Sequence, residues 1–361
     1  MKIIIYLSIF SLILASCAPN QFLISQTGIT PVATAGAPLQ AAALATPTIL
    51  ANPTSQPTVG AKSTNTPAPT PTNKPTTIKK AMPLSDLTGK VPNFDHIVLI
   101  VLENRDYEEV IGNANMPNLN DLAKKNVLMT NAYAVRHPSL PNYIALVSGD
   151  TQNITKDCID CFVNSTNLAD LIEASGRTWK AYEESMPSPC FLGNSKLYVQ
   201  KHNPFIYFDS IRLNPTRCQN NIVPLTQLDG DLSSNQLPNF SFIMPNLCNS
   251  GHDCLLETPD KWVNTMVTQL QASPALGKNS LIIITFDEGN EKNTASCCGL
   301  GSKAGGRIAT VLISPLAKPG FTDGTPISHY GLLKTILEAW TLPNLGHTAL
   351  AESQPIVGPW Q

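Results

Sequence analysis

Acidic and amide side chains follow two buried apolar runs of the sequence. Glu103 and Asn104 come directly after the run 96–102, and Asp287 and Glu288 come directly after 281–286. Ligands of an open parallel sheet bind outside the carboxyl ends of its strands, so we expect these four side chains to share one edge. Oxygen donors from separate strand ends suit a divalent cation. The sequence therefore predicts a metal site there, although each residue alone is also typical of a strand end or turn.

Ser139 is the candidate nucleophile, in the stretch "HPSLPNY". Taken alone, it fits a helix N-cap with Pro141 in the first turn. The Gly-x-Ser-x-Gly pattern of many serine hydrolases is absent. Beside a metal, however, a serine hydroxyl at a helix start can act as a nucleophile, and the helix N-terminus can bind an anion such as phosphate.

Two histidines and one aspartate supply three further candidate positions. His252 and Asp253 lie in "NSGHDC", just after the apolar run 240–244 and between Cys248 and Cys254. A loop histidine without a role is the alternative. His329 opens the last predicted helix and is a weaker metal-ligand candidate, because capping or core packing explains it equally well.

Four motifs resemble the bacterial phosphoesterase family that groups acid phosphatases with phospholipases C. They are "VLENRDYEEVIG", "HPSLPNY", "MPNLCNSGHDC" followed by "TPDKWV", and "IIITFDEG". They recur in the family's order between about residue 94 and residue 345. The family is similar in fold to the alkaline phosphatase superfamily. The resemblance therefore implies hydrolysis of phosphate esters by an alkaline phosphatase-like α/β domain.

Roles for individual residues follow from this resemblance. Ser139 would become phosphorylated, and Asn142 would help to bind phosphoryl oxygens. His252 and Asp253 would assist the leaving group or a second cation. Glu103 and Asn104 would hold the metal or phosphate, and Asp287 and Glu288 would be metal ligands. The oxygen ligands favour Mg²⁺, Mn²⁺ or Ca²⁺, and a histidine such as His329 would admit Zn²⁺.

Departures from the family pattern favour its acid phosphatase side. The phospholipase branch often has threonine and arginine where this chain has Ser139 and Tyr143. A phospholipase C-type diesterase remains the nearer rival, and it would need a wide, apolar-rimmed mouth near residues 184–238. A non-catalytic surface-binding lipoprotein is the other rival. A sulfatase is disfavoured because the arginine of its maturation motif is missing.

The apolar runs indicate the elements that position these residues. Near-continuous apolar strands alternate with amphipathic helices, which predicts an α/β fold with a mostly parallel sheet covered by helices on both faces. Residues 184–238 are polar and predict long loops or a small cap. Strands are expected at 96–104, 127–135, 177–184, 239–246, 279–290 and 307–315, and helices at 116–126, from 139, and at 166–176, 258–273 and 328–340.

The N-terminal part predicts export and a lipid anchor. Residues 1–17 read as a lipoprotein signal peptide whose lipobox ends in Cys17, and residues 18–80 as a disordered Pro/Thr/Ala-rich tether. The catalytic domain would occupy 81–361, outside the cytoplasm, and would reach the membrane only through lipid on Cys17. Eight further cysteines favour disulfides, with a short loop at 158–161 and a brace at 248–254. Cys297 and Cys298 could bond to each other or to different partners.

The resemblance implies a small phosphate ester as the partner, and the composition suggests no other. The formal net charge of -2 gives no reason to expect binding to nucleic acid. The 42% hydrophobic content is enough for a sizeable core. The oligomeric state does not follow from the sequence.

Overall fold

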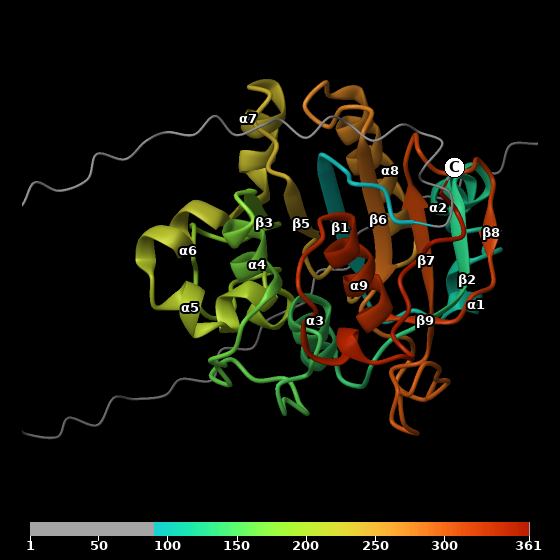
Figure 1. The fold of residues 1–361 in the computed structure, drawn as a ribbon, viewed down its shortest axis with the longest axis horizontal. Helices are drawn as coiled ribbons and strands as arrows, with labels where there is room; N and C mark the ends of the chain where they lie inside the picture. Colours follow the sequence, from blue (N-terminus) through green and yellow to red (C-terminus); the bar gives the residue numbers. More distant parts are fainter. Residues whose placement is uncertain (1–89, 361) are drawn as a thin grey trace, which may run out of the picture. The chain divides into compact units, whose positions relative to one another are not determined.

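The computed structural model describes residues 90–360 of the 361-residue chain (Figure 1). The predicted signal peptide with Cys17 and the predicted tether lie outside the described residues. Within residues 90–360, no helix combines the length and apolar character that crossing a membrane requires.

A single nine-stranded sheet forms the centre of residues 90–360. Its order is β4-β3-β5-β1-β6-β7-β2-β8, with β9 also paired to β2. β7 runs antiparallel to both of its neighbours, and the other pairings are parallel. The predicted α/β fold with a mostly parallel sheet is confirmed. The strands are β1 His96–Leu102, β2 Val127–Tyr133, β3 Trp179–Glu183, β4 Ile222–Pro224, β5 Phe240–Met244, β6 Ser280–Phe286, β7 Arg307–Ile313, β8 Thr322–Asp323 and β9 Ile327–Ser328.

β1 and β6 lie side by side in the middle of the sheet and are buried over almost their whole length. Helices cover both faces, which explains why these strands read as unbroken apolar runs. Their register pairs Leu102 with Phe286, and the Asp287 amide donates to the Leu102 carbonyl at 2.9 Å. The acidic residues that follow the two strands are therefore neighbours at one edge.

Two groups of helices cover opposite faces of the sheet. The longer helices are α2 Pro117–Lys125, α3 Ser139–Ser148, α4 Leu168–Ala174, α8 Glu257–Ala272 and α9 His329–Ala339, with a short α1 at Tyr107–Val110 and a 3-10 turn η5 at Gly346–Ala349. α9 lies in front of the sheet and α8 behind it (Figure 1). Along the strand order, the β1–β2 and β5–β6 connections run toward β8, whereas the β2–β3 connection runs back toward β4. Right-handed crossovers then place α2 and α8 on one face and α3 on the other.

The segment 184–238 is built largely from short helices. Its elements are η2 Gln200–His202, η3 Pro204–Tyr207, α5 Asp209–Arg212, α6 Pro215–Asn221, η4 Leu225–Gln227 and α7 Leu228–Ser233, together with β4. The structure thus resembles the expected small cap more than long loops. That the segment also supplies an edge strand, β4, was not predicted. The buried rings of Phe205, Tyr207 and Phe208 anchor it to the core.

Four disulfides join the eight cysteines of the described residues. The predicted Cys158–Cys161 loop and Cys248–Cys254 brace are both present. Cys297 bonds to its neighbour Cys298, one of the two alternatives that the sequence left open. Cys190–Cys218 fastens α6 to the loop after β3.

Candidate active site

Glu103 and Asn104 leave the sheet at the end of β1, directly beside Asp287 at the end of β6. Glu103 is fully buried. Asn104 has a φ of 56°, a left-handed conformation that asparagine adopts more readily than most residues. This bend turns the Asn104 amide toward Asp287 Oδ1, to which it donates at 3.1 Å. The Asn104 side chain donates to Glu103 Oε2 at 2.9 Å.

Ser139 opens α3 and points into the same cluster. It is 2% exposed, and its Oγ donates to Glu288 Oε1 at 3.0 Å. Glu103 Oε2 lies 3.5 Å from the same oxygen. No side-chain capping bond links Pro138 or Ser139 to the start of the helix. The hydroxyl is therefore directed at carboxylates, and five of the predicted residues, including Asn104 and Asp287, meet at one edge of the sheet.

His137 is part of this cluster and was not singled out from the sequence. Its Nδ1 contacts Glu288 Oε2, and its Nε2 donates to the Asn293 carbonyl at 2.8 Å. Burial alone would lower the pKa of His137. The hydrogen bond and charge of Glu288, with the Asn293 carbonyl, outweigh burial and raise the pKa above its ordinary value. His137 thus holds Glu288 from the side opposite to Ser139.

Tyr143 and His202 enclose Glu103 and were also missed. The Tyr143 hydroxyl donates to Glu103 Oε1, and His202 Nε2 lies 3.1 Å from that oxygen without the alignment of a hydrogen bond. The two rings stack with their centroids 5.3 Å apart. Burial, with the charges of Lys201 and His252, places the pKa of His202 well below its ordinary value. The imidazole beside Glu103 is therefore neutral.

The carboxyl groups of this cluster repel one another in a buried setting. Burial raises the pKa of Glu103 to about 8, although the hydrogen bond from Tyr143 opposes the rise. Burial, together with the charges of Glu103 and Glu288, places the pKa of Asp287 well above its usual range. Within residues 90–360, Asp287 Oδ2 is buried without a hydrogen-bond partner. A cation bound among these oxygens would relieve this repulsion.

No ready-made metal centre is present among the described residues, in that no three His, Cys, Asp or Glu side chains converge closely enough to hold an ion. Hydrogen bonds from Ser139, Tyr143 and Asn104 occupy most of the carboxylate oxygens instead. The site nevertheless gathers oxygen donors of the type that hard cations prefer. Asparagine and serine oxygens add to the three carboxylates.

A cation and an anion cover the N-terminus of α3. The Leu140 amide donates to Asp157 Oδ1 at 3.0 Å, and Lys201 Nζ lies 2.8 Å from Asp157 Oδ2. The position expected for a phosphate at this helix start is thus occupied by a carboxylate. Lys201 also carries the positive charge that acts on Glu103 and Asp287.

Asn142, which was expected to bind phosphoryl oxygens, has its side-chain amide engaged by the backbone of the preceding turn. Its Oδ1 accepts from the amides of Val135 and Arg136 at 3.0 and 2.9 Å. Its Nδ2 donates to the carbonyls of Arg136 and Pro138 at 2.6 and 3.1 Å. An asparagine amide makes about four such bonds, so no capacity is left for a phosphoryl oxygen. Asn142 shapes the turn that carries His137 and Ser139.

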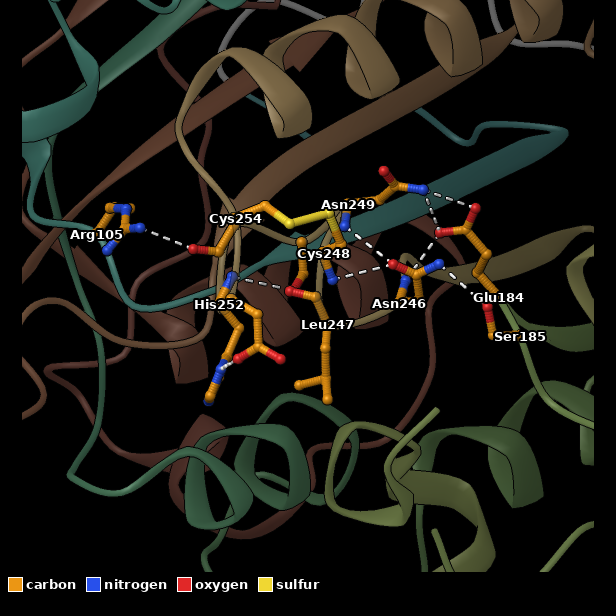
Figure 2. Close-up of a disulfide and its surroundings, with 12 residues drawn as sticks. Arg105, Glu184, Ser185, Asn246, Leu247, Cys248, Asn249, His252 and Cys254 are labelled. Atoms are coloured by element: carbon orange, nitrogen blue, oxygen red, sulfur yellow. Dashed lines mark hydrogen bonds and ion pairs between the residues drawn. A yellow bond between two sulfur atoms is a disulfide. The ribbon is translucent and has the colours of Figure 1, made fainter. Parts of the chain in front are cut away.

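His252 and Asp253 lie on the loop closed by the Cys248–Cys254 disulfide (Figure 2). His252 Nδ1 lies 2.6 Å from Asp253 Oδ1, and the His252 ring is 6.0 Å from that of His202. Arg105 ties this loop to β1 by donating to the Gly251 carbonyl at 2.8 Å. His252 therefore lies at the open side of the site, one ring away from Glu103.

Asn246 and Glu184 give the same loop its shape (Figure 2). Asn246 Oδ1 accepts from the amides of Cys248 and Asn249, each at 3.0 Å. Glu184 accepts from the Asn246 amide and from the Asn249 side chain at 2.9 Å each. The asparagine after β5 thus organises the turn that presents His252.

His329 lies beneath the end of β6. Its Nε2 donates to the Phe286 carbonyl at 3.0 Å, and its Nδ1 is buried without a hydrogen-bond partner among residues 90–360. Burial lowers its pKa to about 4, although the Phe286 carbonyl opposes the shift. A neutral imidazole with one nitrogen bound to a backbone carbonyl has its other nitrogen free, which is the usual arrangement of a metal-ligating histidine.

Comparison with known proteins agrees with these motifs. The Phosphoesterase family profile matches residues 112–343. An acid phosphatase of Aspergillus fumigatus is 34% identical over 281 residues, which cover 74% of this chain and 59% of that protein. A phosphatidylinositol-3-phosphatase of Mycobacterium tuberculosis is 33% identical over 279 residues, covering 75% of this chain and 84% of that protein.

The chain spans about three fifths of the length of the fungal acid phosphatases that it matches. Among solved structures, a member of the alkaline phosphatase superfamily from Vibrio parahaemolyticus has a TM-score of 0.49 at 14% identity. The match covers 70% of this chain and 67% of that one. From the extent of the family match and the identity to these relatives, we conclude that the chain belongs to the phosphoesterase family.

Proposed function

We propose that this chain is a metal-dependent hydrolase of phosphate esters, most simply phosphomonoesters, with Ser139 as the nucleophile. The observation that carries the proposal is the buried Ser139 hydroxyl, 3.0 Å from Glu288 and 3.5 Å from Glu103 at the edge where β1 and β6 end. The acid phosphatases among its relatives support the reaction class.

Ser139 Oγ would attack phosphorus in line and displace the alcohol of the ester. Its proton would pass to Glu288 Oε1, which already accepts the hydrogen bond from the hydroxyl. His137 would keep Glu288 oriented and balance its charge. Water would then release phosphate from the phosphoserine and restore the hydroxyl.

Glu103, Asn104, Asp287 and Glu288 would hold the divalent cation together with the serine oxygen. The buried Asp287 Oδ2 without a partner fits an oxygen-binding cation, and the oxygen set favours Mg²⁺, Mn²⁺ or Ca²⁺. The unpaired Nδ1 of His329 would add a nitrogen ligand and so admit Zn²⁺ as a fourth metal. When bound, the cation would lower the pKa of the serine and neutralise charge on the phosphoryl oxygens.

His252 and Asp253 would serve the leaving group. His252 Nδ1 is engaged by Asp253, and the His252 side chain is 31% exposed, so its Nε2 is available to a substrate. A histidine held by a carboxylate in this way can protonate a departing alkoxide. The neutral, buried His202 next to it would keep the space between His252 and Glu103 free of a competing charge.

A phospholipase C-type diesterase is the second candidate, and one observation favours it. Exposed apolar side chains gather around Gln200, next to Lys201 and His202. Gln200 bonds to the Ile159 carbonyl and to the Gly193 amide, which brings together Ile159, Leu192 and Leu197, exposed by 53%, 49% and 41%. Such a rim suits an amphiphilic substrate.

The cellular location is proposed from the N-terminal sequence. Lipid on Cys17 and the tether 18–80 would hold the enzyme at the outer side of a bacterial membrane. The four disulfides of residues 90–360 support an oxidising compartment. A non-catalytic surface-binding lipoprotein is the remaining alternative.

An assay of the full chain tests these proposals. Phosphate release from a chromogenic monoester would be measured between pH 4 and 9, with and without EDTA, beside a phosphatidylcholine vesicle assay. We expect monoesterase activity that EDTA and Ser139→Ala abolish and that Ser233→Ala, on the exposed surface of α7, preserves. Activity on the vesicles alone would favour the diesterase. No activity on either substrate, with every metal restored, would favour the non-catalytic binding lipoprotein.

A further inference from the structure

A cavity of about 420 Å³ lies beside the turn that carries Ser139. One wall is formed by the loop from Cys298 to Lys303 and another by residues of the segment after α9, including His347 and Glu352. Arg136, three residues before Ser139, also lines it. The proposed reaction uses none of these side chains.

Arg136 differs from the other arginines of the chain. Among residues 90–360, it is the one arginine whose guanidinium has no hydrogen bond, ion pair or aromatic contact. The partners of the others are carbonyls for Arg105, Trp340 for Arg177, and carboxylates for Arg212, Arg217 and Arg307. Arg136 is half-buried. A partly desolvated guanidinium without a partner is the group that an incoming anion would satisfy.

The backbone of Arg136 is held rigidly with respect to Ser139. Asn142 bonds to both its amide and its carbonyl. Gly305 packs so closely that a Cβ there would lie 2.4 Å from the Arg136 carbonyl oxygen. Three residues span at most about 11 Å, so the backbones of Arg136 and Ser139 lie within the length of a small bisphosphate.

The other charges facing the cavity leave it net cationic. Lys303 is exposed and has no partner among the described residues, whereas Glu352 contributes one carboxylate. His347 stacks on Tyr330 with centroids 4.7 Å apart, and its Nε2 lies 3.3 Å from Asp150. Two permanent cations therefore face one free carboxylate, which favours an anionic ligand.

We propose that this cavity binds a second anionic group of the substrate, so that the preferred substrates are small molecules carrying two phosphates. One phosphate would meet Ser139 while the other pairs with Arg136. The inference rests on the proposed function, since it assigns a substrate class to the same site. Arg136 would set specificity and take no part in the chemical step.

The test compares fructose 1,6-bisphosphate with fructose 6-phosphate on the full chain. The ratio of their kcat/KM values would be measured from initial rates for the wild type, Arg136→Gln, Arg136→Lys and Lys278→Gln. Lys278 is exposed and precedes β6, at the opposite edge of the sheet, so its variant controls for net charge. Calorimetric titration of both sugars into Ser139→Ala, with and without Arg136→Gln, gives a readout independent of turnover.

We expect Arg136→Gln to lower the bisphosphate preference by about 10- to 100-fold, the range for losing one charge-assisted hydrogen bond. Arg136→Lys should retain part of the preference, and Lys278→Gln all of it. A ratio within about twofold of the wild type in a folded Arg136→Gln would overturn the inference, as would equal binding of the two sugars. If the wild type turns over neither sugar but calorimetry shows the Arg136-dependent preference, the cavity assignment stands and the proposed catalysis fails.

Discussion

Replacing Asn142 by aspartate is the sharpest test of how the site is assembled. The change conserves the shape of the side chain. One oxygen continues to accept from the amides of Val135 and Arg136, which lie 3.0 and 2.9 Å away. The position of Nδ2 becomes a carboxylate oxygen that faces the carbonyl oxygens of Arg136 and Pro138, at 2.6 and 3.1 Å. All three atoms are acceptors, so no hydrogen bond forms between them.

The cost can be worked from these four bonds. Two donated hydrogen bonds are lost, at about 1 kcal/mol each, and two carbonyls lose their donor in a partly buried turn. An unsatisfied acceptor there adds about 1 kcal/mol or more. We therefore expect Asn142→Asp to lower the free energy of unfolding by about 3–5 kcal/mol, a large share of the 5–15 kcal/mol typical of domains. Activity should fall because Ser139 and His137 share this turn.

Denaturant unfolding at pH 7 with the disulfides intact measures this cost. Asn115→Asp is the matched control, because Asn115 is exposed and its side-chain amide makes no hydrogen bond to the described residues. This substitution should change the free energy of unfolding by less than about 0.5 kcal/mol. Unfolding of Asn142→Asp at the wild-type midpoint, with only KM raised, would refute the argument. That result would return Asn142 to the phosphoryl-binding role expected from the sequence.

Three further predictions concern protons, orientation and metal. Glu183 is buried without a hydrogen-bond partner among residues 90–360, and burial raises its pKa well above the ordinary value. The folded state then keeps a proton that the unfolded chain loses above about pH 4.3. The free energy of unfolding of the wild type should therefore fall relative to that of Glu183→Gln as pH rises, by up to about 1.4 kcal/mol per pH unit. A constant difference between the two proteins from pH 4 to pH 8 would contradict this. His137→Gln should lower kcat about 10- to 100-fold with a smaller change in KM, because Glu288 loses the group that orients it, and an unchanged kcat would exclude that role. Removing divalent ions with EDTA should lower the melting temperature, and restoring them at 100 times Kd should recover about 2.7 kcal/mol of stability; identical melting curves would argue against a metal at Asp287.

The sequence predicts the frame of the site well for a physical reason. β1 and β6 are covered on both faces, so their apolar runs are unbroken and end visibly where the polar residues begin. Parallel pairing then brings the residues after each strand to one edge. Glu103 and Asp287 could be placed together on this argument alone.

The contacts inside the site could not be predicted in this way. His137 meets Glu288 across 151 positions of the chain, and Tyr143 reaches Glu103 across 40. Neither sequence separation produces a periodic pattern in the sequence, because both contacts depend on how α3 packs against the sheet. A tyrosine in an apolar helix and a histidine before a proline look like core and loop residues. Their only hint was proximity to Ser139 in the sequence.

Asn142 and the segment 184–238 show a second limit. A polar residue one turn into a helix near a nucleophile suggests ligand binding, but the preceding turn folds back and uses its whole amide. The three residues of β4 are too few to establish an alternating or apolar pattern. In that segment tertiary packing of aromatic rings, rather than local preference, selects the short helices.

Trapping the phosphorylated enzyme is the measurement that tests the central claim most directly. The full chain would be mixed with a ³²P-labelled phosphomonoester, quenched in acid and digested, and the labelled peptide identified by mass spectrometry. We predict label on Ser139, none in Ser139→Ala, and a loss of turnover of at least about a thousandfold in that variant. Undiminished turnover in Ser139→Ala, or label on another residue, would contradict the account.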